Sequence, residues 1–175
     1  MLGHYENFPK IIHGVARFTH KTSRRKIQKA IVSVFHRLNQ ERCELKEIVY
    51  SSSPSCEVDF EFGIGENSVF TYLDENELSI LEAEIAKKTL MFLDFLCVLQ
   101  YHIVQDSGKR VPLKFDYYML RFEFDRNYME FLVSHERGPQ HVHVEDLIDF
   151  LTRHLERALA DRYSTALKLE GTQTV

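Results

Sequence analysis

The chain has 175 residues, of which 44% are hydrophobic and 27% charged, and its formal net charge is −4. This length and composition predict one folded domain over residues 1–175 and exclude wholesale disorder. The slight negative charge gives no overall reason to expect DNA binding, so a nucleic-acid site would need a local basic patch.

Basic and acidic residues are separated along the sequence. Residues 1–46 carry ten Lys or Arg against three acids, whereas residues 47–86 carry ten acids and no Lys or Arg. In a small domain, repulsion within such an acidic block is destabilising unless nearby positive charge neutralises it. The basic first segment, a second subunit, a cation or a cationic partner could each fill this role.

Cysteine usage and hydropathy predict where the protein works. The cysteines, Cys43, Cys56 and Cys97, form no CxxC motif and leave one unpaired, which indicates a reducing compartment. The first residues lack the layout of a signal peptide. The most apolar run, residues 90–104, is interrupted by Asp94 and Gln100 and is too short to span a bilayer. We therefore expect a cytoplasmic protein without a membrane segment.

The first half of the chain predicts four strands and two helices. A β-branched and aromatic run predicts a strand over residues 11–19, and an apolar stripe predicts a helix from Thr22 or Ser23 to about residue 39. A short strand over 46–51 precedes a turn at 51–55. Strands over 58–64 and 67–73 follow, and the glycines at 63 and 65 are expected to end the first of them. Residues 74–89 predict a second helix that opens with acids.

The second half predicts three more strands and a final helix. Residues 90–104 fit either a buried helix or a central strand, and we expect a strand from about residue 92. A turn at 106–109 leads to strands over 113–124 and 128–135. A helix follows over 144–162, and the tail from about 164 is expected to fray.

This order predicts an α+β domain. We expect a mostly antiparallel sheet of six to seven strands, with three helices packed mainly on one face. The opening of strand, helix and two strands is compatible with a ferredoxin-like half. That analogy concerns the fold and carries no function.

The first candidate site is the start of the predicted helix at 22–39, where cations oppose the helix dipole. Free N–H groups, hydroxyls and cations together suit a phosphate or a nucleic-acid backbone. The alternative is a solvated helix face, or pairing with the acidic strand. The residues are Lys21, Thr22, Ser23, Arg24, Arg25, Lys26 and Lys29.

The second candidate is a row of carboxylates on one strand face, formed by Glu57, Asp59 and Glu61. Such oxygens could bind a hard cation such as Mg²⁺. The alternative is the exposed face of an antiparallel strand, paired with Arg17 or Lys46 on a neighbouring strand. No ligand motif accompanies the row, so we predict no metal and no cofactor.

The third candidate is the polar segment 134–143, which joins the last predicted strand to the last helix. We consider His135, Arg137, His141 and His143 as catalytic candidates. Histidine and arginine beside Glu136 could supply a base and an anion-stabilising cation for phosphodiester or acyl chemistry. His141 and His143 could also form one edge of a metal site. The alternative is an exposed loop that helps to start the helix.

Aromatic residues are dense over 115–128, where we expect core or interface packing and a β-bulge near Tyr118. Exposed tyrosines beside Arg121 or Arg126 would instead favour base stacking. The layout of meander, histidine loop and terminal helix is similar to that of small toxin-like RNases. This resemblance lies in layout, covers less than half of the chain and transfers no residues.

We interpret the chain first as a protein that works by association. It would form a homo-oligomer whose basic helix start contacts nucleic-acid backbone or an acidic protein surface. The first alternative is a phosphodiester-cleaving, RNase-like enzyme that uses the histidine loop. The second is a sensor of a small anion at Thr22, Ser23 and Arg24.

Overall fold

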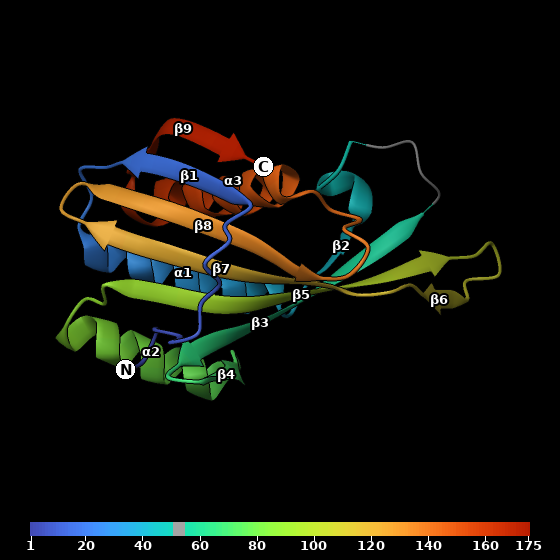
Figure 1. The fold of residues 1–175 in the computed structure, drawn as a ribbon, viewed down its shortest axis with the longest axis horizontal. Helices are drawn as coiled ribbons and strands as arrows, with labels where there is room; N and C mark the ends of the chain where they lie inside the picture. Colours follow the sequence, from blue (N-terminus) through green and yellow to red (C-terminus); the bar gives the residue numbers. More distant parts are fainter. Residues whose placement is uncertain (51–54) are drawn as a thin grey trace.

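A computed structural model describes residues 1–50 and 55–175 of the chain. In this part, three α-helices pack against one open antiparallel sheet of nine strands (Figure 1). The helices are α1 (Arg24–Leu38), α2 (Glu75–Lys87) and α3 (Val144–Tyr163). The strands are β1 (Gly14–Thr19), β2 (Arg42–Glu44), β3 (Cys56–Glu66), β4 (Val69–Tyr72), β5 (Phe92–Val104), β6 (Arg110–Pro112), β7 (Asp116–Asp125), β8 (Tyr128–Arg137) and β9 (Lys168–Thr174).

The sheet runs in the order β2-β3-β5-β7-β8-β1-β9, with β4 paired to β3 and β6 paired to β5. Every strand pair is antiparallel, which confirms the predicted α+β class. β1 pairs with β8 and β9 and not with β3, so the opening segment does not build the ferredoxin-like half. The long β5 confirms the strand expected from about residue 92.

Helices α1 and α3 cover one face of the sheet, behind it in Figure 1, and α2 packs against α1. Strand alternation supplies the other side of this core. The Phe35 ring of α1 stacks on Phe62 of β3 at 4.2 Å and meets Phe95 of β5 edge-on at 4.7 Å. In α3, Phe150 stacks on Phe60 at 5.4 Å. No helix in the part of the chain described is long and apolar enough to cross a membrane.

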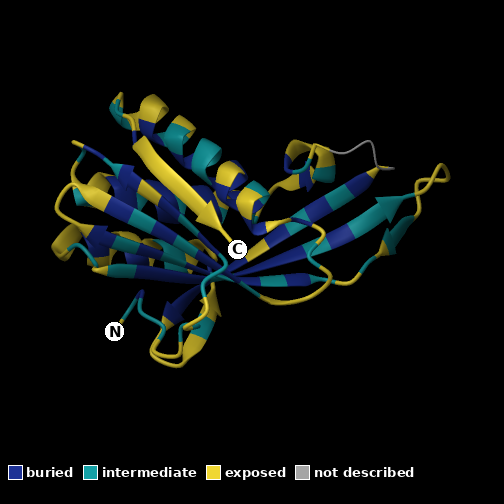
Figure 2. Ribbon diagram, turned by 45° about the horizontal axis from the view of Figure 1, so that its top comes forward, coloured by how far each residue is buried: buried dark blue, intermediate teal, exposed yellow. Residues whose placement is uncertain are grey.

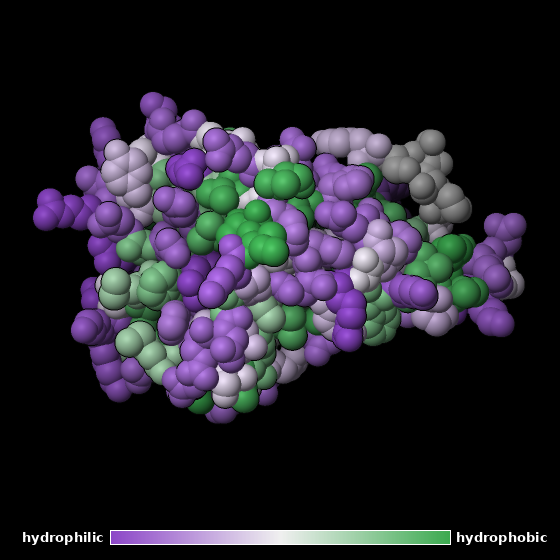
Figure 3. Space-filling model, in the orientation of Figure 1, coloured by the Kyte–Doolittle hydropathy of each residue, from purple (hydrophilic) through white to green (hydrophobic). Residues whose placement is uncertain are grey.

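The N-terminal segment crosses the other face, which we call the open face (Figure 1). Its anchor is a buried ion pair, in which the Arg121 guanidinium donates to both oxygens of Asp94 at 2.7 Å. The same aspartate accepts the Tyr5 N–H at 2.7 Å, and the Phe8 ring lies 4.3 Å from the guanidinium carbon. Figure 3 shows this face as a mixture of hydrophilic and hydrophobic side chains.

Local interactions changed several predicted boundaries. Residues 11–13 precede β1 instead of belonging to it, and Ile11 is exposed. The strand predicted over 46–51 is wrong within 46–50. A capping box between Glu44 and Glu47 closes a 3₁₀ turn (η1, Leu45–Glu47), and strand pairing falls earlier, in β2. The turn predicted at 51–55 lies mostly outside the described residues. Strand β3 continues through both glycines because β4 pairs along them.

Two strands were not expected from the sequence. β6 pairs with the end of β5, and the tail predicted to fray from 164 forms β9 on β1. Figure 2 shows β9 as an exposed strand, and all seven of its residues are exposed. Its backbone hydrogen bonds to β1 hold it in place without burying its side chains. The sequence of β9 therefore has no hydrophobic pattern that would predict a strand. The predicted irregularity near Tyr118 is a register shift between Tyr117 and Tyr118.

Candidate functional site

The start of α1 is built as predicted. Ser23 is the N-cap, and its side chain accepts the backbone N–H of Lys26 at 3.3 Å. The first turn carries no acidic residue, so the positive end of the helix dipole is reinforced by cations rather than neutralised. Buried Ile27 and Ala30 lie on the core side, and the cations lie on the outer surface. This arrangement leaves a concentrated positive field at one helix end.

The cations at this helix start have no acidic partner in the part of the chain described. No carboxylate lies within 4.0 Å of the charged atoms of the five Lys and Arg residues at 21–29. Arg25 Nε donates to the Ile85 carbonyl of α2 at 3.1 Å, and Lys26 Nζ lies 5.3 Å from the Tyr163 ring centre. These contacts position the side chains and leave their charge uncompensated.

Tertiary structure brings two further cations to the same end of the molecule. The Gln28 side chain donates to the Leu90 carbonyl at 2.6 Å, which places the residues after α2 beside α1. The β7–β8 hairpin is close because His20 N–H donates to the Asn127 carbonyl at 3.0 Å. We use "basic end" for the following seven exposed or half-exposed residues. They are Lys21, Arg24, Arg25, Lys26, Lys29, Lys88 and Arg126.

Polar contacts also order the turn that precedes α1. The Thr22 and Thr165 hydroxyls are hydrogen-bonded to each other, and His20 Nδ1 donates to the Thr22 carbonyl at 2.9 Å. Burial, with Arg24 nearby, lowers the pKa of His20. His20 is therefore neutral at pH 7 and contributes packing rather than charge. The anion-binding candidates Thr22 and Ser23 are thus both engaged in local hydrogen bonds.

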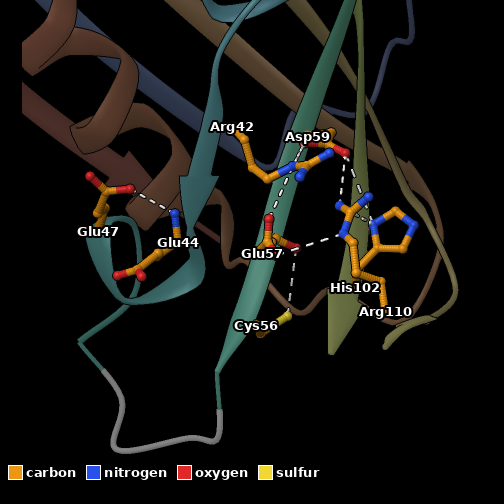
Figure 4. A network of polar contacts seen from close by, with 8 residues as sticks. All are labelled: Arg42, Glu44, Glu47, Cys56, Glu57, Asp59, His102 and Arg110. Atoms are coloured by element: carbon orange, nitrogen blue, oxygen red, sulfur yellow. Dashed lines mark hydrogen bonds and ion pairs between the residues drawn. The ribbon is translucent and has the colours of Figure 1, made fainter. Parts of the chain in front are cut away.

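The acidic row has its own partners, and Figure 4 shows those of Glu57 and Asp59. Arg42 Nε lies 3.0 Å from Glu57 and 3.1 Å from Asp59, on the neighbouring strand β3. From the other side, the Arg110 guanidinium lies 3.6 Å from Glu57 and 3.3 Å from Asp59. Glu61 accepts the Gln100 side-chain amide at 2.9 Å. Two arginines therefore neutralise most of the row.

The partners suggested from the sequence, Arg17 and Lys46, are wrong. Arg17 lies on β1, on the far side of the sheet, and pairs with Glu130 at 3.7 Å. Lys46 lies in the 3₁₀ turn and pairs with Glu44 at 3.0 Å. Only strands β2 and β5 flank the acidic part of β3, so cations on those strands and on β6 reach it.

The basic end and the acidic row lie at opposite ends of the molecule (Figure 1). Strand β5 begins beside α1 at Phe92 and reaches the row at His102, opposite Glu57. The six residues of extended strand from Phe92 to Val98, opposite Glu61, and the ten to His102 correspond to about 20 and about 33 Å. At these distances the acidic row is screened from the basic end and cannot neutralise it. The unpaired positive charge therefore remains available to an external partner.

The histidine loop is organised by a buried carboxylate, Asp116, at the start of β7. Its Oδ1 accepts His135 Nε2 at 2.9 Å and the Gln140 N–H at 2.6 Å. Its Oδ2 accepts the Tyr101 hydroxyl at 2.6 Å and the His141 N–H at 2.8 Å. Burial would raise the pKa of Asp116, but these four donors outweigh it and hold the pKa below its usual value. The carboxylate is therefore ionised and anchors the loop.

The four catalytic candidates make different contacts. His135 is 15% exposed, with Nε2 committed to Asp116. The Arg137 guanidinium lies 4.4 Å from the centre of the Tyr117 ring. His141 stacks edge-on against Tyr101, and His143 is the exposed N-cap of α3. An acid–base role would have to use Nδ1 of His135, while the other three side chains serve packing or lie at the surface.

Sequence reasoning missed the residues that support this loop. Asp116 and Tyr101 come from strands β7 and β5, and His13 comes from the segment before β1. His13 Nδ1 accepts the backbone N–H of His135 at 2.9 Å. Gly138 has φ +112°, and a Cβ there would lie 2.2 Å from the Phe115 carbonyl oxygen. The Gly138-Pro139 pair was a local signal of a tight turn, but nothing in the sequence connected it to Asp116.

Neither the loop nor the acidic row assembles a metal site. Over residues 1–50 and 55–175, no three His, Cys, Asp or Glu side chains are grouped so that they could hold a metal ion. The acidic row is held by arginines, and His141 and His143 acquire no further ligand there. Comparison with known proteins finds no family model, no curated protein and no solved structure that matches this chain.

Proposed function

We propose that this protein works by association and that its basic end binds the phosphate backbone of a nucleic acid. The single observation that carries the proposal is the uncompensated charge at the start of α1. Several cations lie within about two helical turns, on the end of the helix whose dipole is already positive. Such a field attracts polyanions, and neutralising phosphates releases their condensed counterions.

The energetic cost of placing cations at the start of α1 also supports an anionic partner. Each cation in the first helical turn costs a few tenths of a kcal/mol, and acids are found instead in the first turns of α2 and α3. The chain also places two arginines around the acidic row, where they neutralise it locally. The basic end thus keeps an unfavourable charge pattern that a bound anion would relieve.

A pair of double variants with equal charge changes tests the proposal. Lys21→Ala/Lys29→Ala removes two charges from the basic end, and Lys109→Ala/Lys114→Ala removes two exposed charges near β6. None of these four ammonium groups makes an ion pair in the described residues, so folding should be little affected. Circular dichroism and thermal unfolding check that both variants remain folded.

The measurement is fluorescence anisotropy with a labelled DNA duplex of about 15 base pairs, between about 50 and 200 mM salt. If both lysines contact phosphates, the first variant should reduce the slope of log K against log salt by about 1.8. The control should keep the wild-type slope. Equal slopes for the two variants, or no binding by the wild type at low salt either to this duplex or to a single strand of equal length, would refute the proposal.

Two alternatives have weaker support. Phosphodiester cleavage by the histidine loop would need groups that converge, whereas the Arg137 guanidinium lies over Tyr117, His143 is the exposed N-cap of α3 and His135 Nε2 is bonded to Asp116. A small-anion sensor at the start of α1 would need free hydroxyls, whereas Thr22 is bonded to Thr165 and Ser23 caps the helix. A labelled RNA that is recovered shortened after incubation with the protein would favour the enzyme.

The homo-oligomer expected from the sequence remains part of the proposal, and the free edge of β9 is the surface that supports it. A second copy could pair antiparallel with β9 around Gly171. Such a register places Lys168 opposite Thr174 and Glu170 opposite Thr172, so no like charges meet. Unpaired backbone groups on an exposed edge strand favour this kind of pairing.

A further inference from the structure

We propose that the nucleic acid recognised at the basic end is single-stranded, with Tyr128 as a stacking platform for a base. This inference rests on the proposed function and names the class of nucleic acid. Duplex binding needs only phosphate contacts, whereas an unpaired strand also offers base faces to an aromatic ring. The basic end has such a ring beside it.

Tyr128 follows the two-residue turn that joins β7 to β8, and 57% of the residue is exposed. This exposure leaves the ring accessible to a ligand. Arg126 is exposed in the same turn. A guanidinium next to an exposed phenol ring is the pair of groups that binds a phosphate and the base attached to it.

The hairpin is fixed against the start of α1. His20 N–H donates to the Asn127 carbonyl at 3.0 Å, and Thr19 is directly opposite Tyr128 in the β1–β8 pairing. Lys21 is therefore two residues after Thr19, the residue of β1 that is paired with Tyr128. Met129 is buried against α1, so the adjacent Tyr128 projects from the opposite face of the sheet, and a strand whose phosphates lie along the cations of α1 would reach this ring by passing around the β7–β8 hairpin.

A second exposed tyrosine provides a matched control. Tyr72 of β4 is 44% exposed and lines the same shallow surface depression as Asp59 and Glu61. It resembles Tyr128 in type and exposure but lies among carboxylates, which repel phosphates. Removing its ring should therefore leave nucleic-acid binding unchanged.

The experiment measures the affinity of the wild type, Tyr128→Ala, Tyr128→Phe and Tyr72→Ala for single-stranded oligo(dT), oligo(U) and a duplex of equal length. Loss of one stacked base lowers affinity by about five-fold or more. We expect this loss for Tyr128→Ala on both single strands and less than about two-fold on the duplex. Tyr128→Phe keeps the ring and should bind as the wild type does, which also shows that the hairpin remains folded.

Two results would overturn the inference and leave the proposed function standing. The first is equal single-strand affinity for Tyr128→Ala and Tyr72→Ala, with salt-dependent binding still lost in Lys21→Ala/Lys29→Ala. The second is wild-type binding to the duplex without binding to either single strand. Absence of binding to all three nucleic acids would overturn both proposals. A loss confined to oligo(U) or to oligo(dT) supports stacking on that strand alone.

Discussion

Replacing Asp116 by Asn tests whether this buried carboxylate holds the histidine loop in place. The side chain keeps its size, so no cavity is created, but one of its two acceptor oxygens becomes an NH₂ group. In either orientation the new NH₂ faces one backbone N–H, that of Gln140 or that of His141. The Tyr101 hydroxyl can rotate to compensate, whereas the backbone donor cannot.

The expected cost follows from these contacts. One buried backbone N–H left without an acceptor costs about 1–3 kcal/mol. The remaining hydrogen bonds lose the assistance of the negative charge, which adds about 1 kcal/mol. Relief of the desolvation of the carboxylate offsets part of this sum. We therefore expect Asp116→Asn to lower the free energy of unfolding by about 2–4 kcal/mol.

Urea denaturation at pH 7 measures this change, with Asp59→Asn as the control. Asp59 also contacts two arginines but is partly exposed on the open face, so its substitution should cost less than about 1 kcal/mol. A shift of the midpoint at constant slope would show a change in stability alone. If the two substitutions cost the same, the buried carboxylate does not have the structural role assigned to it here.

The pH dependence of the stability difference between wild type and Asp116→Asn provides an independent check. Hydrogen bonds hold the pKa of Asp116 below its unfolded value of about 3.9. A depressed pKa in the folded state means that the stabilisation is present above about pH 4 and is lost as the pH falls through the folded-state pKa. The difference between wild type and Asp116→Asn should therefore be constant near neutrality and shrink at lower pH. A difference that grows below pH 4 would contradict the argument.

Two further predictions concern Gly138 and self-association. Gly138→Ala should destabilise the fold by about 2 kcal/mol or more, because the residue has positive φ and the new Cβ would collide with the Phe115 carbonyl. Gly108→Ala, also at positive φ but with no atom within 4 Å of the new Cβ, should cost about 1 kcal/mol in the same urea experiment. Equal costs would show that the collision is relieved by movement of the loop. Pairing through β9 predicts an average mass in sedimentation equilibrium that rises with concentration, and a constant monomer mass would exclude it.

Regular periodicity made much of the architecture predictable. Helices α1 and α3 carry apolar stripes that are continuous over their whole length, and β3 alternates apolar and acidic residues. Each of these patterns has one physical cause, the burial of a single face. The run at 90–104 fitted either a helix or a strand, and the structure shows it as the strand β5, as expected from about residue 92.

Elements with few buried side chains were not predictable from periodicity. All residues of β9 are exposed, and the strand is held by backbone pairing with β1 and by the hydrogen bond from the Thr19 hydroxyl to Glu170. β2 is three residues long, and a capping box beside it closes a turn where a strand was expected. In both cases the partner strand or the local side chain decides the structure, and the residues of the element itself give a weak signal.

The sequence by itself determined where charge is concentrated and which segments bury a face, because both follow from residue order. It could not determine which charges meet, because strands distant in the chain become neighbours only in the sheet. Arg42 and Arg110 pair with Glu57 and Asp59, whereas in the described residues no carboxylate lies within 4.0 Å of the cations at the start of α1. The Asp116 cluster likewise exists only after β5, β7 and the segment 134–143 have come together. Segment charge was therefore a property of the sequence, and compensation of charge was a property of the tertiary structure.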